Sequence, residues 1–392
     1  MRPKVDVWRL MAGYAAGNFT VCTGALFVAG LMPFIVRDLG VTPAAAGQMA
    51  TTFALTYAVS AALMGRFGAR VDRRAAMALG LAGFAAGCAI CMTASSFPLL
   101  LGGRVVMAIG ASLFTPSAAI LATWMVPEAL RGRAMGLVYS GLSIAMLVGI
   151  PLTAWLAASL SWRAGYGALC VLAIGLAIIL HRCTPPQQVA AGEPGLGLLV
   201  VVRHARMRAA LGVTLFQTAA QYVFYTYLSQ WAASALGIVS PGFNSLALLV
   251  FGIGGFTGNI VGSHAADRFD TDSTILASLA LLAGALFCLY LAPGMPGVVL
   301  PLMAVWGLAG YSIQAAQQRR IVGLVPHWRA VTLSLNSTCV YLGIASGGVL
   351  GGLLLASGLA AQLPLAGAAF ALLALWSLRL SAQGRQPLSL SP

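Results

Sequence analysis

The chain has 392 residues, of which 60% are hydrophobic and only 8% are charged, and its formal net charge is +14. A soluble protein needs about a quarter of its residues charged, so this composition excludes an ordinary soluble domain and indicates a membrane protein. Because lipid offers no hydrogen bonds to the backbone, we expect an all-α fold. The excess of arginine lies between apolar runs and indicates membrane topology, so no nucleic-acid partner is expected.

Apolar segments of about twenty residues, long enough to cross a bilayer, follow one another along the chain. The sequence predicts twelve spans, at residues 10–35, 45–66, 75–95, 98–121, 134–159, 163–181, 208–234, 243–264, 273–292, 296–317, 331–356 and 361–379. The stretch CTPPQQVAAGEPGLG after the sixth span is typical of a linker. We therefore expect an N-terminal six-helix bundle over 1–182, a cytoplasmic linker over 183–206 and a C-terminal six-helix bundle over 207–392.

The basic residues predict the orientation, because lysine and arginine accumulate on the cytoplasmic side of membrane proteins. With the N-terminus inside, all 22 lysines and arginines are cytoplasmic except Arg37 and Arg163 outside and Arg104 within a span. Both termini are thus expected in the cytoplasm of a bacterial cell, with the chain in its inner membrane. One chain supplies both bundles, so a monomer is expected to suffice.

The two halves repeat each other. The loop GARVDRR (68–74) follows the second span and GSHAADRFD (262–270) follows the eighth. The segments VPEALRGRAMGLVYSGLSIAMLVG (126–149) and VPHWRAVTLSLNSTCVYLGIASG (325–347) lead into the fifth and eleventh spans. Parallel repeats of this kind are a transporter architecture, with the substrate bound near the middle of the bilayer.

These motifs resemble the major facilitator superfamily, specifically its twelve-span drug:proton antiporter branch and the arabinose-efflux-permease-like exporters within it. The loop motif of that family is matched by Gly68, Asp72, Arg73 and Arg74, and its second copy by Gly262, Asp267 and Arg268. The motif of the fourth span is matched by Arg104 and Gly110, and the exporter signature G-x7-G-x-P of the fifth span by Gly141, Gly149 and Pro151. The resemblance covers essentially the whole chain and implies two pseudo-symmetric six-helix bundles.

The cytoplasmic loops predict a conformational latch. Asp72 is expected beside the start of the eleventh span, where helix N–H groups favour a carboxylate. The arginines that can pair with it are Arg73, Arg74, Arg131 and Arg133, and Asp267 with Arg268 can latch onto the fifth span in the same way. The alternative is a basic loop that faces lipid headgroups. In the fifth span, the three signature residues favour close packing and bending, or ordinary helix packing only.

Arg104 is predicted about 10 Å deep in the membrane. An intramembrane arginine costs at least a few kcal/mol unless it finds acceptors in the bundle interior. Related exporters often carry an acid in the first span, but here Ala25 and Leu26 take its place. Arg104 is therefore expected to bind carbonyls or side chains of the first span, such as those of Asn18, Thr20 and Thr23, to contact the substrate, or to snorkel to the interface.

Proton coupling has little support from the residues. All 8 acids lie in loops, at span ends or in the linker, and all 4 histidines are on the cytoplasmic side. A coupling proton is thus a candidate partner with no intramembrane carrier in the sequence.

The seventh span, FQTAAQYVFYTYLSQW, carries Gln217, Gln221 and Tyr225 on one helical face. The tenth span adds Trp306, Tyr311, Gln314 and Gln317, and the eleventh span adds Asn336 and Tyr341. Neutral amides and aromatic rings can line a pocket for molecules that are part polar and part apolar. The alternative is hydrogen bonding between helices, worth about 0.6 kcal/mol per pair, which is the interpretation favoured for Asn336.

We expect a secondary transporter that exports a small amphipathic drug or metabolite by alternating access. The alternatives are an importer or uniporter without proton coupling, and a membrane sensor or scaffold that does not transport. An enzyme would need a nucleophile–base pair or a metal group within the spans, and the sequence offers neither. The 7 cysteines form no disulfide framework or metal motif, so no cofactor or metal is expected.

Overall fold

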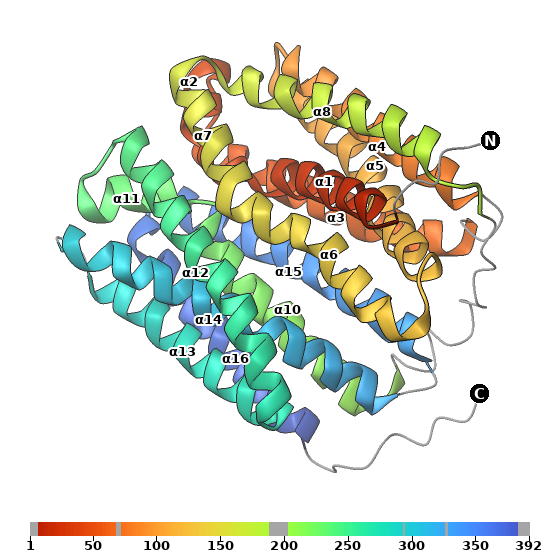
Figure 1. The fold of residues 1–392 in the computed structure, drawn as a ribbon. Helices are drawn as coiled ribbons and strands as arrows, with labels where there is room; N and C mark the ends of the chain where they lie inside the picture. The colour runs from red at the N-terminus through yellow and green to blue at the C-terminus, as the bar shows by residue number, and fades with distance from the viewer. Residues whose placement is uncertain (1–6, 68–71, 188–202, 293–294, 326–327, 383–392) are drawn as a thin grey trace. The chain divides into compact units, whose positions relative to one another are not determined.

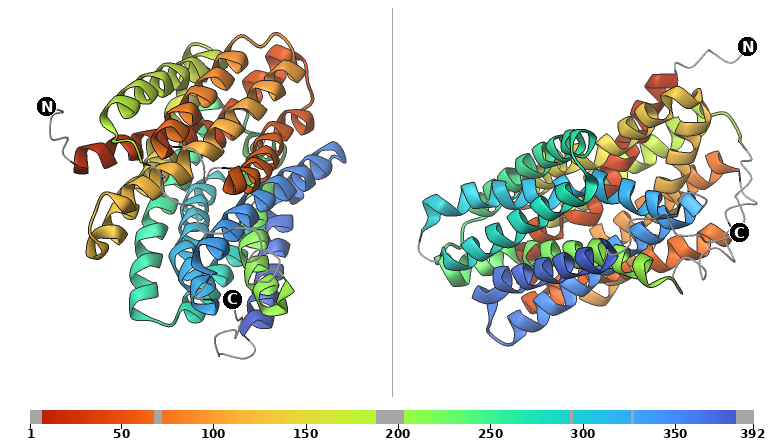
Figure 2. Two further views of the ribbon diagram at one scale, coloured as in Figure 1. Left: turned by 90° about the vertical axis from the view of Figure 1, so that its right-hand side faces the viewer. Right: turned by 90° about the horizontal axis from the view of Figure 1, so that it is seen from below.

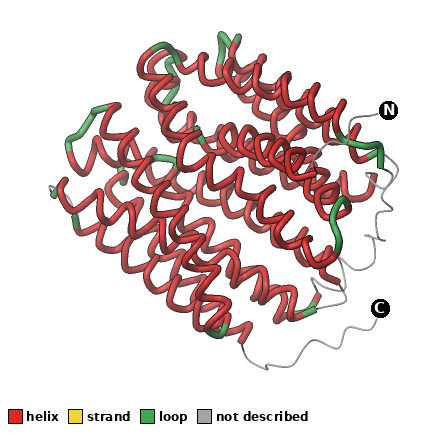
Figure 3. The backbone as a smooth tube through the Cα atoms, in the orientation of Figure 1, coloured by secondary structure: helices red, strands yellow, loops and turns green. Residues whose placement is uncertain are grey.

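The computed structural model describes residues 7–67, 72–187, 203–292, 295–325 and 328–382, which are helical almost throughout (Figures 1 and 3). The chain forms two compact units. Unit 1 comprises residues 1–41 and 52–192, and unit 2 comprises residues 42–51 and 193–392. Helix α3 (Pro43–Phe67) contributes its first residues to unit 2 and the rest to unit 1.

Unit 1 is built from long helices that pack side by side. Helix α4 lies along α5 and α8, and α1 packs on α6. The bounds are α1 (Val7–Leu26), α2 (Val28–Leu39), α4 (Arg73–Met92), α5 (Phe97–Trp124), the 3₁₀ turn η2 (Glu128–Leu130), α6 (Arg131–Ile144), the π segment η3 (Ala145–Gly149), α7 (Ile150–Ser159) and α8 (Trp162–Cys183).

Unit 2 has the same kind of construction. Helix α12 lies along α14, while α10 packs on α15 and α16 (Figures 1 and 2). The bounds are α10 (Ala205–Tyr225), α11 (Leu228–Leu236), α12 (Pro241–Arg268), α13 (Thr271–Leu291), α14 (Pro296–Leu324), α15 (Arg329–Ala356), the 3₁₀ turn η5 (Ala360–Gln362) and α16 (Leu363–Ala382).

The helices have the length and composition of membrane spans. Among the described residues, 9 helical stretches are long and apolar enough to cross a bilayer, or 10 if the bent pair α1–α2 is one span. The two other predicted spans fall on α3 and on α10–α11. Glutamine, threonine and serine residues within these helices lower their mean hydropathy. The all-α membrane fold predicted from the sequence is confirmed.

The first span of each half is broken, although its apolar sequence predicts one straight helix. Helices α1 and α2 meet at Phe27 with a bend of 47°. Pro33 lies inside α2 and cannot donate to the carbonyl of Ala29, which weakens the helix beside the bend. In unit 2, α10 and α11 are separated at Thr226 and Tyr227.

Both broken spans also end alike. Gly40 follows α2 with φ +63°, and Gly237 follows α11 with φ +67°. A left-handed residue closes a helix end at little cost only when it is glycine. The sequence repeat therefore recurs as a structural repeat, with a break and a glycine stop at corresponding places in the two halves.

A row of glycines brings α12 against α14. A Cβ atom on Gly254, Gly258 or Gly262 would lie 2.1, 2.2 or 1.9 Å from a main-chain oxygen of α14. No side chain fits there, so the two backbones approach as closely as in other small-residue seams of membrane helices. The spacing of four residues, which puts the three glycines on one face of α12, thus serves the packing of two helices.

Candidate functional site

Two glutamines of α10 converge on one carbonyl of α14. The Nε2 atoms of Gln217 and Gln221 donate to the Gly310 oxygen at 2.9 and 3.2 Å. Residues four apart share a helical face, so both amides reach the same neighbouring helix. Both side chains are buried, at 3% exposure. The polar face predicted on the seventh span thus lies in the interior of unit 2.

The same face continues toward the start of α10. Gln317 donates from Nε2 to the carbonyl of Ala210 at 2.7 Å and to the hydroxyl of Thr214 at 3.0 Å. That hydroxyl in turn donates to Asn336 Oδ1 at 2.6 Å. These contacts tie α10, α14 and α15 together, as expected for structural hydrogen bonds between helices.

Aromatic rings from the same helix α10, from α12 and from α14 pack together in unit 2. The Trp306 ring centroid lies 4.2 Å from that of Phe251, 4.9 Å from that of Phe224 and 6.4 Å from that of Tyr225. Tyr311 contacts Phe251 edge-on at 6.1 Å. We call Gln217, Gln221, Tyr225, Phe251, Trp306 and Tyr311, with Phe224, the amide–aromatic cluster.

Two polar atoms of this cluster are buried without a hydrogen-bond partner among the described residues, namely Gln221 Oε1 and Trp306 Nε1. An unpaired buried acceptor or donor costs about 1–3 kcal/mol, so native proteins keep few of them. Gln314, also predicted as a site residue, is half-buried on α14.

In unit 1, Arg104 is fully buried on α5. Its guanidinium donates to the carbonyls of Gly24 and Ala25, the second at 3.1 Å, and lies 4.7 Å from the Phe53 ring centroid. The two carbonyls belong to the last turn of α1, beside the bend into α2. A bend removes carbonyls from the regular helix bonds, so the arginine finds acceptors without any acid in the span.

Asn18 and Thr23 lie on α1 near this arrangement. Asn18 donates from Nδ2 to the Val138 carbonyl at 3.0 Å and accepts from the Thr115 hydroxyl at 3.0 Å, which joins α1 to α6 and α5. The Thr23 hydroxyl is buried and has no partner among the described residues.

The signature residues of the fifth span pack on α1. A Cβ on Gly141 would lie 2.2 Å from the Ala15 carbonyl, and one on Gly149 would lie 2.1 Å from the Thr23 hydroxyl. Pro151 follows directly in α7. The N–H of Ile150 bonds to the Ala145 carbonyl, five residues back, which is the π pattern. Since Pro151 has no N–H to give, the helix widens just before it.

Asp72 caps helix α4. Its Oδ1 accepts from the backbone N–H of Arg74 at 3.1 Å and from that of Gln187 at 2.9 Å, while Arg73 N–H donates to the Gln187 carbonyl. A carboxylate at the start of a helix stabilises the helix, because it accepts from free N–H groups and interacts favourably with the helix dipole. Gly68 lies outside the described residues. The latch predicted for Asp72 stays a prediction.

The second copy of the loop motif contributes an ion pair within unit 2. Asp267 Oδ1 lies 2.5 Å from Arg319 Nη1, and both side chains are about half exposed. Arg268 is exposed at the end of α12. In unit 1, Arg131 is exposed, and Arg133 lies 4.9 Å from the ring centroid of Trp8.

Two features have no counterpart among the sequence predictions. Gly310 accepts both glutamine amides through its carbonyl, and an isolated glycine in an apolar run gives no signal for that. Arg320, predicted only as a cytoplasmic charge, is 8% exposed and pairs with Asp272 and with the Ser381 hydroxyl. A buried arginine needs such partners, but the sequence does not name them.

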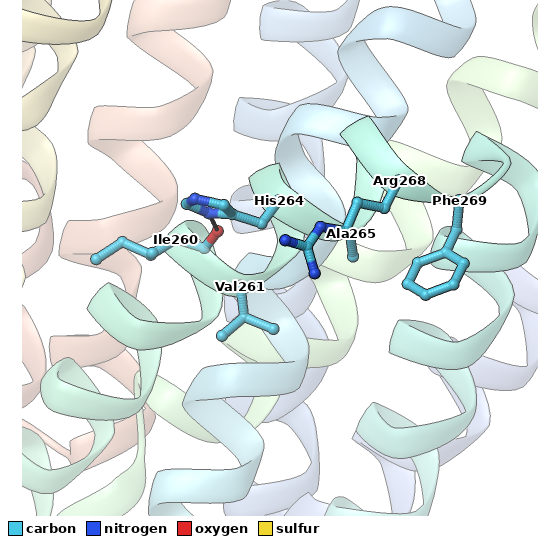
Figure 4. Close-up of a pocket in the computed structure, with 6 residues that line it drawn as sticks. All are labelled: Ile260, Val261, His264, Ala265, Arg268 and Phe269. Carbon is cyan, nitrogen blue, oxygen red and sulfur yellow. Dashed lines mark hydrogen bonds between the residues drawn. The ribbon is translucent and has the colours of Figure 1, made fainter.

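An open pocket lies along the C-terminal part of α12, and none of its lining residues belongs to the amide–aromatic cluster (Figure 4). It is lined by Ile260, Val261, His264, Ala265, Arg268 and Phe269, all from one helix and its C-cap. His264 bonds through Nδ1 to the Ile260 carbonyl of its own helix. A single helical surface offers no enclosing walls, so we assign the pocket no substrate role.

Comparison with known proteins agrees with the fold. A family model described as Major Facilitator Superfamily matches residues 14–347. The "Inner membrane transport protein YdhP" of Escherichia coli strain K12 is 27% identical over 375 residues, 95% of each chain. The "Chloramphenicol resistance protein" of Streptomyces lividans is 29% identical over 304 residues, 76% of this chain and 77% of that one.

The solved structure of a bacterial homologue of the human lysosomal transporter Spinster, inward-facing and unoccupied, is similar with a TM-score of 0.74. It is 18% identical and covers 97% of both chains, so the likeness concerns the fold. The family match spans most of the chain and agrees with the helical architecture and the paired loop motifs. This protein belongs to the Major Facilitator Superfamily and is a multi-pass membrane protein of a transporter family.

Proposed function

We propose that this protein exports a small amphipathic drug or metabolite across the bacterial inner membrane by alternating access. The observation that carries the proposal is the amide–aromatic cluster, where Gln221 Oε1 and Trp306 Nε1 are buried and find no hydrogen-bond partner in the described part of the chain. Native proteins leave few buried polar atoms unpaired, and a molecule bound beside the aromatic rings can supply partners for these two. The name of the Streptomyces relative supports export of a compound of this kind.

The second candidate is an importer or uniporter without proton coupling. It is favoured by the placement of all 8 acids outside the middle of the predicted spans. Arg104, the one charge predicted inside a span, bonds to main-chain carbonyls of α1. No carboxylate or histidine is thus placed to carry a proton through the membrane interior.

We also propose both termini in the cytoplasm, bundles over 1–182 and 207–392 joined by the linker 183–206, and a monomer as the working unit. The distribution of lysine and arginine supports this orientation. Reporter fusions at predicted loops test it: a fusion after Arg133 should be cytoplasmic, and one after Leu160 should be periplasmic. The reverse pattern would overturn the orientation.

Untargeted mass spectrometry of medium and cells tests the direction of transport. Cells that express the protein are compared with cells that express Gln221→Ala, at matched membrane levels. The control is Gln318→Ala, which removes an exposed glutamine of α14. Export predicts a compound enriched in the medium with the wild type and the control but not with Gln221→Ala.

Accumulation inside the cells would establish the importer instead. If the three strains agree in both compartments, including after challenge with chloramphenicol, the proposal of transport through this cluster is wrong.

A further inference from the structure

Gly310 sets the orientation of two side chains at once. Its carbonyl oxygen receives hydrogen bonds from both Gln217 and Gln221. A carbonyl can only accept, so each amide must turn its NH₂ group toward Gly310 and its oxygen away. The main chain of α14 thereby decides which end of each glutamine stays available.

The two available oxygens differ. Gln217 Oε1 accepts from the Thr218 hydroxyl at 3.4 Å. Gln221 Oε1 is buried with no partner among the described residues, and the whole side chain is 3% exposed. Gln221 therefore offers an unused acceptor in a buried environment of low dielectric constant, where a donor from a ligand gains most.

The absence of a side chain at position 310 is what lets the amide lie there. A Cβ atom on Gly310 would come within 2.6 Å of both Cδ and Oε1 of Gln221. Trp306 precedes Gly310 by one helical turn and adds a buried, unpaired indole N–H among aromatic rings. The amide–aromatic cluster contains only neutral side chains.

We propose that Gly310 is a positioning residue that fixes Gln221 Oε1 as an acceptor for the substrate, and that the substrate is an uncharged molecule with an N–H or O–H donor next to an apolar ring. This inference rests on the proposed transport function. The donor bonds to Gln221, the ring packs among Phe251, Trp306 and Tyr225, and an acceptor on the same molecule can bond to Trp306 Nε1.

The first experiment tests the positioning without any substrate. Purified Gly310→Ala is expected to melt several degrees below the wild type, because its methyl group collides with the Gln221 amide. Gly323→Ala, on the same helix with open space around its Cβ, is the control and should melt like the wild type. The double variant Gly310→Ala, Gln221→Ala should regain part of the loss, since the amide is gone. A Gly310→Ala protein as stable as the control would overturn the positioning role.

The second experiment tests the substrate class with matched probes. Benzamide carries an N–H donor, and N,N-dimethylbenzamide lacks it. Wild-type protein should bind benzamide about tenfold more tightly, measured by the rise of the melting temperature with probe concentration. Gln221→Leu and Gly310→Ala should both lose this preference, whereas Gly323→Ala should keep it. Equal binding of the two probes, a preference retained in Gln221→Leu, or no binding of benzamide would overturn the donor class.

The outcomes separate the two proposals. A benzamide preference that depends on Gln221, with no compound moved by cells, supports the recognition chemistry and overturns the transport function. Export that depends on Gln221 without a donor preference supports transport and overturns the substrate class.

Discussion

The guanidinium of Arg104 donates to the carbonyl oxygen of Ala25 at 3.1 Å, between positions 79 residues apart in the sequence. Ala25 stands where related exporters often carry an acid, and the main chain supplies the acceptor instead. The bend after α1 and the buried arginine therefore depend on each other. The bend opens the carbonyls, and the arginine satisfies them.

Replacement of Arg104 should destabilise unit 1. Arg104→Met leaves the carbonyls of Gly24 and Ala25 without this donor, at a cost of about 1–3 kcal/mol each. Arg104→Lys should be intermediate, since an ammonium cannot span two carbonyls as a planar fork does. Thermal unfolding in detergent measures both, with Arg37→Met, an exposed residue of α2, as the control. An Arg104→Met protein as stable as that control would contradict the account.

The seam between α12 and α14 should reject even one methyl group. A Cβ on Gly258 would lie 2.2 Å from the Leu308 carbonyl, so Gly258→Ala should cost about 1–3 kcal/mol. Gly284→Ala, on α13 with nothing near its Cβ, should be neutral or stabilise by up to about 1 kcal/mol. Thermal unfolding of the two variants in parallel measures the difference in stability. Equal stability would show that α12 and α14 can move apart to accommodate the methyl group.

The two ion pairs at the end of α14, to Asp267 of α12 and to Asp272 of α13, should contribute differently to stability. Arg320 has a side-chain exposure of 6% beside Asp272, whereas Arg319 and Asp267 are 46% and 60% exposed. Arg320→Met removes the partner of the Asp272 carboxylate, which is 32% exposed, and the buried bond to Ser381, and should cost about 1–3 kcal/mol. Arg319→Met should cost less than about 1 kcal/mol, because exposed pairs contribute little. The ranking is checked by thermal unfolding, and a reversed order would refute it.

Asp72→Asn separates the capping role of this residue from the predicted latch. Asparagine caps helices as well as aspartate does, so stability should change by less than about 0.5 kcal/mol. The lost charge should still slow transport about two- to fivefold, the size of a charge–dipole contact. Asp270→Asn, which changes the N-cap of α13 in the same way, is the control and should leave transport unchanged. Loss of transport in both variants would remove the case for a latch at Asp72.

The sequence predicts those parts of the fold that depend on composition and on the length and repetition of apolar segments. Apolar runs, their breaks and the repeated loops predict the helices of both halves. The bend at Phe27 was missed because the apolar run continues across it and Pro33 lies six residues further on. The π segment was missed for a similar reason, since Pro151 indicates a kink but not the pattern of hydrogen bonds that accommodates it.

The candidate site was predicted only in part. A period of four on α10 predicts that Gln217 and Gln221 share a face, and the structure buries that face. Their common acceptor, the Gly310 carbonyl, could not be predicted. Every backbone carbonyl can accept a hydrogen bond, and nothing in the sequence distinguishes that of Gly310 from the others. Which oxygen stays unpaired depends on that acceptor, and therefore on the packing of α10 against α14.

The π segment also determines which residues of the fifth span face α1. Gly141 and Gly149 are eight residues apart, which in a regular helix places them about 80° out of line. The wider turn between them takes up one additional residue and brings both glycines onto α1, at Ala15 and Thr23. Deletion of one residue between 145 and 149 would leave a plain α-helix with the glycines seven apart, about 20° out of line and still facing α1, so it is the eighth residue that requires the wider turn. The signature, with seven residues between its two glycines, thus fits a helix that contains one π turn.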